Sequence, residues 1–420
     1  MFCLVLSGGG TKGVYHIGVW RALRELEVQV DAFIGVSIGA LIAGFLAQGL
    51  DDVLEEIRKT MVIDNMLALP EELVEHDEIK LDKNSIHAVR KFLTSTLEKK
   101  GLDSSPLRMI LETKLDEERI RASGKDLGIV TVNISDLHSQ EVFLEDMEKG
   151  FLVDYLMASA AFPGFEQPVI EGKKYIDGGL YDNIPYAMAR KRGYRNIIVS
   201  DTSGLGRNRK PQIEGTRTIY IKNSIDFGSV FDFDRKFMDS FTLLGYLDTL
   251  RTFGKLSGYS YFIEPNRRLE ATFISEWQKS GMSFPVVPER MRYDRNKILV
   301  FLECAASILQ VDRISRYTYE SLIQAIELRR IEIEASIDTN KSSAPGGLRS
   351  LAPTIKASIR NHSFSECPYY YYRTVQEAFS GSVRGNMLKM LTAIYPELVA
   401  GVVWLEQQAK IGSCIHDHYR

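Results

Sequence analysis

Residues 1–48 read MFCLVLSGGGTKGVYHIGVWRALRELEVQVDAFIGVSIGALIAGFLAQ. This stretch contains two short apolar segments, residues 1–6 and 32–36, and each is followed by a turn that contains glycine. Helical patterns follow the turns at residues 14–26 and 40–48. Short apolar runs that end at such turns are typical of buried strands. The stretch therefore predicts two consecutive strand–turn–helix units, as in an α/β fold with a mostly parallel sheet.

The second turn carries the pentapeptide Gly35-Val36-Ser37-Ile38-Gly39, which fits the pattern G-x-S-x-G. A serine at a sharp strand-to-helix turn has a strained backbone, and small residues on either side let the strand and the helix approach closely. Its hydroxyl then lies at a helix N-terminus, where free amides favour a developing negative charge. The pattern predicts that Ser37 is a nucleophile.

The first turn, residues 7–13 (SGGGTKG), is compatible with two uses. It fits G-x-G-x-x-G between a strand and a helix, which is a dinucleotide-binding pattern. That use requires an acidic residue at the end of the second strand, but Asp31 precedes this strand and Ser37 follows it. Lys12 follows Gly10 too closely for a Walker loop. We therefore favour the other use, in which the backbone amides of the turn form an oxyanion hole.

A nucleophilic serine needs a base, and the histidines have unsuitable positions. The seven lie in a predicted helix, in segments without a strand end, or far downstream: His16, His76, His87, His138, His362, His416 and His418. A different base is available at Asp177, which follows a short predicted strand at residues 174–176. Gly178 and Gly179 leave space around its carboxylate. An Asp-Gly-Gly sequence alone is commonly only a turn, so its interpretation depends on the other motifs.

The three motifs, residues 8–13, 35–39 and 177–179, occur in the order that is typical of patatin-like phospholipases, and the chain resembles this family. The stretch Ala158–Phe165 also resembles the family's segment before the catalytic aspartate. The resemblance covers residues 2–205. It implies a three-layer α/β hydrolase with a mostly parallel central sheet.

The resemblance also implies the roles of the motif residues. Ser37 is expected to be the nucleophile and Asp177 the base, which together form a Ser–Asp dyad. The expected oxyanion hole consists of the amides of Gly8, Gly9, Gly10, Thr11 and Ile38. The remaining motif residues are expected to support these groups, with Lys12 as an anchor of the loop: Lys12, Gly13, Gly35, Gly39, Gly178 and Gly179. The motifs imply no metal and no organic cofactor.

The composition indicates a globular chain with few options for charged partners. It has 420 residues, 45% of them hydrophobic, and 52 basic against 55 acidic residues give a formal net charge of −3. Such a chain can bury the core of one large domain and a second region. Because no strong basic field exists, the composition argues against nucleic-acid partners. We expect membrane contact to be peripheral, local and apolar.

The cysteines favour a reducing compartment. Cys3, Cys304, Cys367 and Cys414 show no C-x-x-C spacing, which predicts free thiols and gives no metal site. The first predicted strand begins without a basic leader, so we expect a cytoplasmic protein with peripheral membrane association. The uncharged residues 32–50 could span a bilayer by length, but the strand, serine turn and helix explain them better.

The chain is expected to consist of a catalytic domain, residues 1–265, and a mainly helical region of unknown role, residues 266–420. In the first region, strands at 216–221 and 261–263 are expected to extend the sheet, with a helix at 231–256 between them. In the second region, the pattern predicts one long helix at 298–336 and a packed loop that contains the four tyrosines 369–372.

The resemblance implies a lipid acyl hydrolase of the phospholipase A type, which cleaves fatty-acyl esters of glycerophospholipids at a membrane surface. A lysophospholipase or a neutral-lipid esterase with the same dyad is an alternative. A further alternative is a regulated effector in which residues 266–420 bind a regulatory partner or a second copy of the chain. A dinucleotide-binding oxidoreductase is the last alternative.

Overall fold

The computed structural model describes residues 2–60, 74–75, 78–79, 103–209, 211–230, 232–279, 297–342, 367–378, 385–386, 389, 395 and 397–416. It divides the chain into two compact units, Met1–Phe253 and Gly254–Arg420. The division lies before the predicted domain boundary at residue 265, because the segment after Phe253 packs into the core of the second unit. Each unit is described separately.

The first unit is built on a mixed sheet with the strand order β10-β9-β1-β2-β5-β8-β7, in which β6 also pairs with β5. Its parallel part consists of β1 (Phe2–Leu6), β2 (Val30–Val36), β5 (Asp126–Asn133), β9 (Asn196–Asp201) and β10 (Arg217–Lys222). Its antiparallel part adds β6 (His138–Phe143), β7 (Val169–Ile170) and β8 (Lys173–Asp177). A mostly parallel sheet and the strand at 216–221 are thus confirmed.

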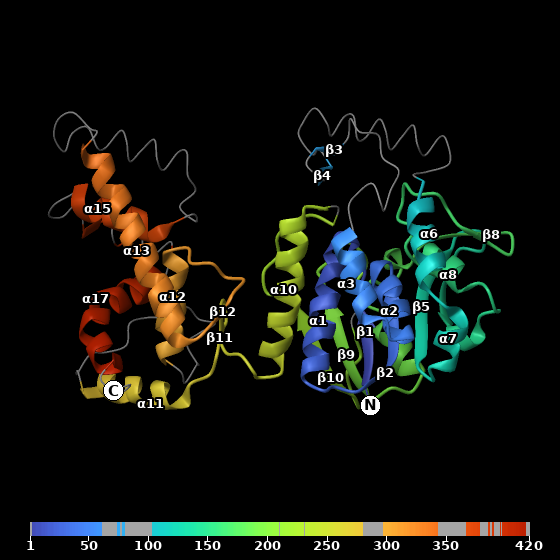
Figure 1. Ribbon diagram of the computed structural model, residues 1–420, viewed down its shortest axis with the longest axis horizontal. Coiled ribbons are helices and arrows are strands. Elements are labelled where there is room, and N and C mark those ends of the chain that lie inside the picture. The colour runs from blue at the N-terminus through green and yellow to red at the C-terminus, as the bar shows by residue number, and fades with distance from the viewer. Residues whose placement is uncertain are drawn as a thin grey trace. The chain divides into compact units, whose positions relative to one another are not determined.

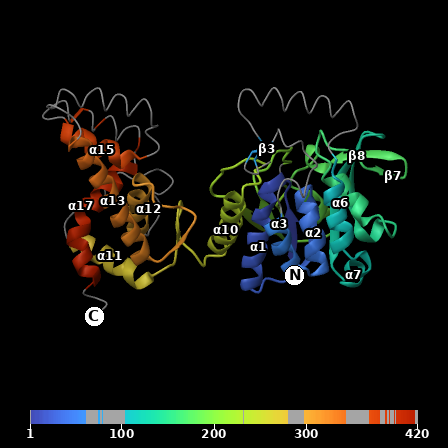
Figure 2. The same ribbon diagram turned by 45° about the horizontal axis from the view of Figure 1, so that its top comes forward.

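Helices cover both faces of this sheet (Figures 1 and 2). They are α1 (Val14–Glu25), α2 (Ile38–Gln48), α3 (Asp51–Thr60), α6 (Ser105–Lys114), α7 (Glu117–Ala122), α8 (Leu152–Ser159), α9 (Tyr186–Lys191) and α10 (Arg235–Thr252). The short 3-10 helices η1 (Gly10–Gly13), η3 (Leu144–Asp146) and η4 (Gly178–Leu180) complete the unit, together with the separate ribbon β3 (Val74–Glu75) and β4 (Glu78–Ile79).

Alternation along the strands explains the three layers. On one face, Val5 of β1 and Ile34 of β2 pack against Met188 of α9. On the other face, Phe33 of β2 meets Trp20 of α1 with ring centroids 5.5 Å apart. Because successive side chains of a strand point to opposite faces, near-continuous apolar strands are covered on both sides. The uncharged segment 32–50 is therefore a buried strand and helix, as predicted.

The second unit has its own apolar core. It contains β11 (Phe262–Ile263), α11 (Arg267–Lys279), α12 (Lys297–Ile308), β12 (Arg316–Tyr317), α13 (Tyr319–Ser342), α15 (Pro368–Ala378) and α17 (Glu397–His416). Phe273 of α11 packs against Trp404 of α17, with ring centroids 5.4 Å apart. The buried carboxylate of Glu303 accepts hydrogen bonds from the backbone amides of Tyr259, Ser260 and Tyr261 at 2.8–2.9 Å.

Three predictions for this region were wrong. The strand at 261–263 does not extend the large sheet, because β11 pairs with β12 in a separate two-stranded sheet. The predicted helix 298–336 is two helices, α12 and α13, because the chain turns at Gln310, where φ is +56°, and then forms β12. The tyrosines 369–372 lie in α15 and not in a loop, since Pro368 occupies the first helical position, where proline is favourable.

None of the described helices has the length and the apolar composition needed to cross a membrane.

Candidate active site

Strand register places Ser37 and Asp177 at the same level of the sheet. Val36, the last residue of β2, is opposite Val130 of β5, and the next residue of β5, Thr131, is opposite Asp177. Ser37 and Asp177 therefore lie on either side of β5. They do so although β2 pairs with β5 in parallel and β8 pairs with it in the antiparallel direction. The side chain of Ser37 lies near the carboxylate of Asp177 and lowers its pKa.

Ser37 has the strained backbone that the G-x-S-x-G pattern predicts, with φ +55° and ψ −132°. The turn is tight because a Cβ on Gly35 would lie 2.3 Å from the carbonyl oxygen of Gly39. A Cβ on Gly39 would in turn lie 2.5 Å from the carbonyl oxygen of Leu6. Larger residues at these two positions would separate β1, β2 and α2, so the glycines hold the serine at the strand end.

A second serine supports this turn. The hydroxyl of Ser159, at the end of α8, accepts a hydrogen bond from the amide of Ser37 at 2.9 Å. It donates to the carbonyl oxygen of Val130 at 2.7 Å. Ser159 belongs to the stretch Ala158–Phe165, which resembles the family's segment before the catalytic aspartate, but the sequence predicts no role for it.

Asp177 is a buried acid with few compensating contacts. It is 4% exposed, and its Oδ1 accepts the amide of Gly179 at 2.7 Å. Burial raises the pKa of Asp177 to about 6, because a charge is poorly solvated there, while the hydrogen bonds from Ser37 and Gly179 lower it. At neutral pH the carboxylate is ionised and can accept a proton from the serine.

The glycine loop uses only some of its amides internally. The amide of Gly8 donates to the carbonyl of Asn183 at 3.3 Å, and that of Thr11 donates to the carbonyl of Val230 at 2.9 Å. Within the described part of the chain, the amides of Gly9 and Gly10 donate to no backbone carbonyl. Two of the predicted oxyanion donors, Gly8 and Thr11, are therefore already engaged in the free protein.

Lys12 anchors the loop from behind, as expected. Its ammonium group contacts Asp226 at 2.7 Å, and its side chain is 7% exposed. Asp226 belongs to a loop at residues 223–234 that sequence reasoning did not connect with the site. The same loop supplies Val230, which accepts the Thr11 amide.

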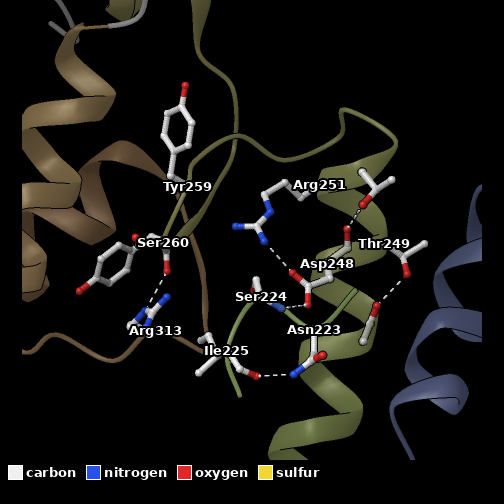
Figure 3. A network of polar contacts seen from close by, with 12 residues as sticks. Asn223, Ser224, Ile225, Asp248, Thr249, Arg251, Tyr259, Ser260 and Arg313 are labelled. Atoms are coloured by element: carbon white, nitrogen blue, oxygen red, sulfur yellow. Dashed lines mark hydrogen bonds and ion pairs between the residues drawn. The ribbon is translucent and has the colours of Figure 1, made fainter. Parts of the chain in front are cut away.

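The loop 223–234 is fixed where it begins (Figure 3). The backbone amide of Ser224 donates to Asp248 of α10 at 3.0 Å, and Arg251 holds the other carboxylate oxygen at 2.7 Å. The side-chain amide of Asn223 donates to the carbonyl of Ile225 at 3.1 Å. These contacts give the loop a defined position beside the glycine turn.

A cavity of about 860 Å³ opens over the serine. Its walls combine motif residues with apolar side chains: Gly9, Gly10, Thr11, Ser37, Ile38, Leu41, Leu107, Ala160, Phe162, Phe165, Asp177, Gly179, Leu180, Asn183, Leu205, Val230 and Phe233. The other predicted site residues do not line this cavity: Gly8, Lys12, Gly13, Gly35, Gly39 and Gly178.

A second cavity of about 470 Å³ continues from the first. The two share Ile38, Leu41 and Leu107. Every residue that lines the second cavity is apolar: Val14, Ile17, Ile38, Leu41, Ile42, Phe45, Leu54, Leu107, Ile110 and Leu111. Such a cavity suits a hydrocarbon chain, because water gains no hydrogen bonds there.

The described histidines do not replace Asp177. His16 is buried, with Nδ1 2.7 Å from the hydroxyl of Ser200 and Nε2 2.9 Å from the carbonyl of Ser7. Burial lowers the pKa of His16 to about 4. It does not line the cavity, and neither does the exposed His138 on β6. The positions outside the described residues are His76, His87, His362 and His418; His416 ends α17.

The described residues contain no group of three His, Cys, Asp or Glu side chains that could hold a metal ion.

Comparison with known proteins agrees with this geometry. Residues 4–190 match the family model of the patatin-like phospholipases. This segment is a patatin-like phospholipase domain. The matched segment ends before β9, so the last parallel strands and the loop 223–234 lie beyond the matched residues.

Curated relatives share this domain. The chain is 32% identical over 206 residues to a patatin-like phospholipase domain-containing protein of Caenorhabditis elegans, a match that covers 48% of this chain and 14% of the relative. It is 26% identical over 203 residues to lysophospholipase NTE1 of Cryptococcus neoformans, covering 48% of this chain and 11% of that protein. The chain thus matches only a small part of the length of these relatives.

Among solved structures, the chain aligns with VipD from Legionella pneumophila over 95% of this chain and 90% of that one, with 14% identity and a TM-score of 0.38.

Proposed function

We propose that the patatin-like domain hydrolyses fatty-acyl esters of glycerophospholipids. The observation that carries this proposal is that Ser37 and the buried carboxylate of Asp177 lie at the same level on either side of β5 and line the same largely apolar cavity. A hydroxyl paired with a base and open to an apolar space is suited to attack a lipid ester.

In the proposed reaction, the Ser37 oxygen attacks the ester carbonyl while Asp177 takes its proton. The resulting oxyanion is stabilised by the amides of Gly9 and Gly10, and by Ile38, whose amide begins α2. When the carbonyl re-forms, the C–O bond to the lipid breaks and Asp177 returns the proton to the departing alcohol. Water then attacks the acyl-enzyme, Asp177 takes the water proton, and the fatty acid leaves as Ser37 regains its proton.

The second cavity supports a long acyl chain as the group that is transferred. It shares Ile38 and Leu41 with the cavity that Ser37 lines, and its own lining contains no polar residue. Each buried methylene contributes about 0.8 kcal/mol, so an extended chain is a strong binding determinant. A lysophospholipid, which has one chain, is the second candidate substrate, because lysophospholipase NTE1 is among the relatives.

Contact with a lipid surface is part of the proposal. Leu180 and Leu205 line the first cavity and are 44% and 65% exposed. Apolar side chains at the rim of a lipid-binding cavity can enter the interface of a membrane and lower the cost of extracting substrate. Free thiols at Cys3, Cys304 and Cys367 support a reducing, cytoplasmic location.

The test is fatty-acid release from vesicles of diacyl phospholipid or micelles of lysophospholipid, with a chelator present. Ser37→Ala and Asp177→Asn are expected to lose at least about 10³-fold in rate, because the residues of a catalytic unit are individually essential. Ser123→Ala, which removes a hydroxyl from the end of α7, is the matched control and should retain full activity. Release of fatty acid by the Ser37→Ala protein would overturn the proposal.

A further inference from the structure

Asn183 is the buried polar residue of the cavity whose side chain has no explained role. It follows η4, lies six positions after Asp177 in the sequence, and is 1% exposed. Within the described residues, neither its Oδ1 nor its Nδ2 has a hydrogen-bond partner. Nearly all buried side-chain amides in native proteins are paired, and leaving one unpaired costs stability.

The backbone of Asn183 fixes where this side chain lies. Its amide donates to the carbonyl of Arg207 at 2.8 Å, and its carbonyl accepts the amide of Gly8 at 3.3 Å. Asn183 is thereby tied to the glycine loop on one side and to the segment after β9 on the other. Because both backbone groups are used, the Cα of Asn183 is held beside the glycine loop.

Three glycines make the space for the carboxamide. A Cβ on Gly8 would lie 2.4 Å from Oδ1 of Asn183, and a Cβ on Gly179 would lie 2.9 Å from the same atom. A Cβ on Gly206 would lie 2.8 Å from its Cγ. The carboxamide therefore packs against backbone and is held in a narrow slot.

This slot lies between the two reacting groups. The same Cβ position on Gly8 is 3.2 Å from Cβ of Ser37, and that on Gly179 is 3.0 Å from Oδ1 of Asp177. Asn183 also lines the cavity that contains both residues. A polar group that is unpaired in the free protein and lies beside the nucleophile is available to bind substrate.

We infer that Asn183 is a further substrate-contacting residue, whose side-chain N–H donates a hydrogen bond to the carbonyl oxygen of the scissile ester beside the amides of Gly9 and Gly10. The inference rests on the proposed function. The hydrogen bond strengthens as the oxygen becomes an oxyanion, so Asn183 stabilises the transition state more than the bound ester. Leaving this amide unpaired in the free protein lowers its stability, but it keeps a hydrogen-bond donor in position for the substrate.

The decisive variant is Asn183→Leu, which keeps the approximate size and removes the amide. We expect kcat to fall about 10²-fold with KM little changed, as for the loss of one oxyanion donor. We also expect the melting temperature to stay equal or rise, because no hydrogen bond is lost and an unpaired polar group is removed. Should this variant fail to fold, Asn183→Ala and Asn183→Ser test the same point, since serine keeps a donor and should retain the higher kcat.

Asn133→Leu is the matched control. Asn133 is also 1% exposed, but its side chain is paired with Asp136, donating to Oδ2 at 3.1 Å and accepting the backbone amide at 3.0 Å. We expect Asn133→Leu to lower the melting temperature and to leave kcat per folded molecule unchanged. The same result for Asn183→Leu would show a structural role and overturn the inference.

A second measurement separates this inference from the proposed function. The rate at which a fluorophosphonate modifies Ser37 should also fall in Asn183→Leu, because its phosphoryl oxygen occupies the position of the ester carbonyl oxygen. If wild type hydrolyses lipid, Ser37→Ala does not, and Asn183→Leu matches wild type in both rates, only the role of Asn183 is wrong. If wild type neither hydrolyses lipid nor reacts with the probe, the proposed function fails and the inference fails with it.

Discussion

Asp177 combines burial with a proposed catalytic role, and the two have opposite requirements for its charge. A carboxylate must be ionised to accept the serine proton, but burial favours its protonated form and raises its pKa to about 6. The activity and the stability of the protein should therefore depend on pH in opposite directions around this value.

The first prediction concerns activity. We expect kcat/KM to be constant at neutral pH and to fall about tenfold per unit as the pH drops below about 6, because only ionised Asp177 acts as the base. His16, whose pKa is lowered to about 4, stays uncharged over most of this range. The measurement is a pH–rate profile with an uncharged ester, with circular dichroism at each pH to confirm folding. A flat profile across pH 6 would contradict the assigned base.

The second prediction concerns stability. Because the folded-state pKa of Asp177 lies above the value of 3.8 for a free side chain, ionisation destabilises the folded protein at pH 7, by on the order of 3 kcal/mol. Asp177→Asn should therefore melt at a higher temperature than wild type at pH 7. The difference should shrink as the pH falls through about 6 towards 3.8. The exposed Asp52→Asn serves as a control, and a lower melting temperature for Asp177→Asn at pH 7 would refute the argument.

At the scale of elements, residues of α1, α2, α3 and α6 line the second cavity. The third prediction is that Ile42→Trp, which fills this space, shifts the preference towards esters of shorter acyl chains while a short-chain ester is cleaved at nearly the wild-type rate. The measurement is kcat/KM over a series of chain lengths. Leu46→Phe on the same helix is the control, since Leu46 is buried outside the cavity and should change stability without changing the preference.

The contacts between η1 and the loop 223–234 give the fourth prediction. Asp226→Asn removes the countercharge of the nearly buried Lys12, whereas Asp226 itself is 65% exposed at its side chain. Because solvent partly screens this pair, we expect a loss of about 1 kcal/mol and a melting temperature lower by a few degrees. Thermal unfolding at low and high salt measures this effect. Equal melting of the two proteins at low salt would show that Lys12 does not depend on Asp226.

Local patterns were sufficient to predict the elements that carry Ser37 and the glycine loop, because the turns, strands and helices there are continuous in sequence. The Asp-Gly-Gly turn predicts Asp177 as a candidate base. Its position in the sheet at the level of Ser37 depends on the pairing of β8 with β5. Asn183 and Asp226 reach the site through long-range contacts that leave no periodic signal. The sequence pattern also does not predict that the helix 298–336 is interrupted, because the turn at Gln310 has no glycine or proline to mark it.

At the scale of the whole molecule, the second unit has the features of an independently folding domain. Its core includes large buried side chains such as Phe273, Phe301 and Trp404, and Glu303 satisfies three backbone amides inside it. A continuous apolar core of its own is what a domain needs to fold alone. That the region binds a regulatory partner or a second copy of the chain stays a prediction.

The fifth prediction is that residues 254–420 expressed alone fold into a helical domain with a cooperative thermal transition. Circular dichroism and hydrogen exchange of the fragment are the measurements, with the full chain as the reference. A fragment that lacks protected amides in α12 and α17 would show that its core depends on the first unit.

The position of β1 has a consequence for the order of events during synthesis. β1 pairs with β2, which follows it closely, and with β9, which begins at Asn196. A ribosome that adds roughly 5–20 residues per second needs on the order of ten to thirty seconds to proceed from β2 to β9. During this interval the nascent chain presents an open strand edge that chaperones can recognise, and it carries a nucleophile whose base has not yet been translated. The proposed dyad is therefore incomplete until Asp177 has been synthesised and β8 pairs with β5.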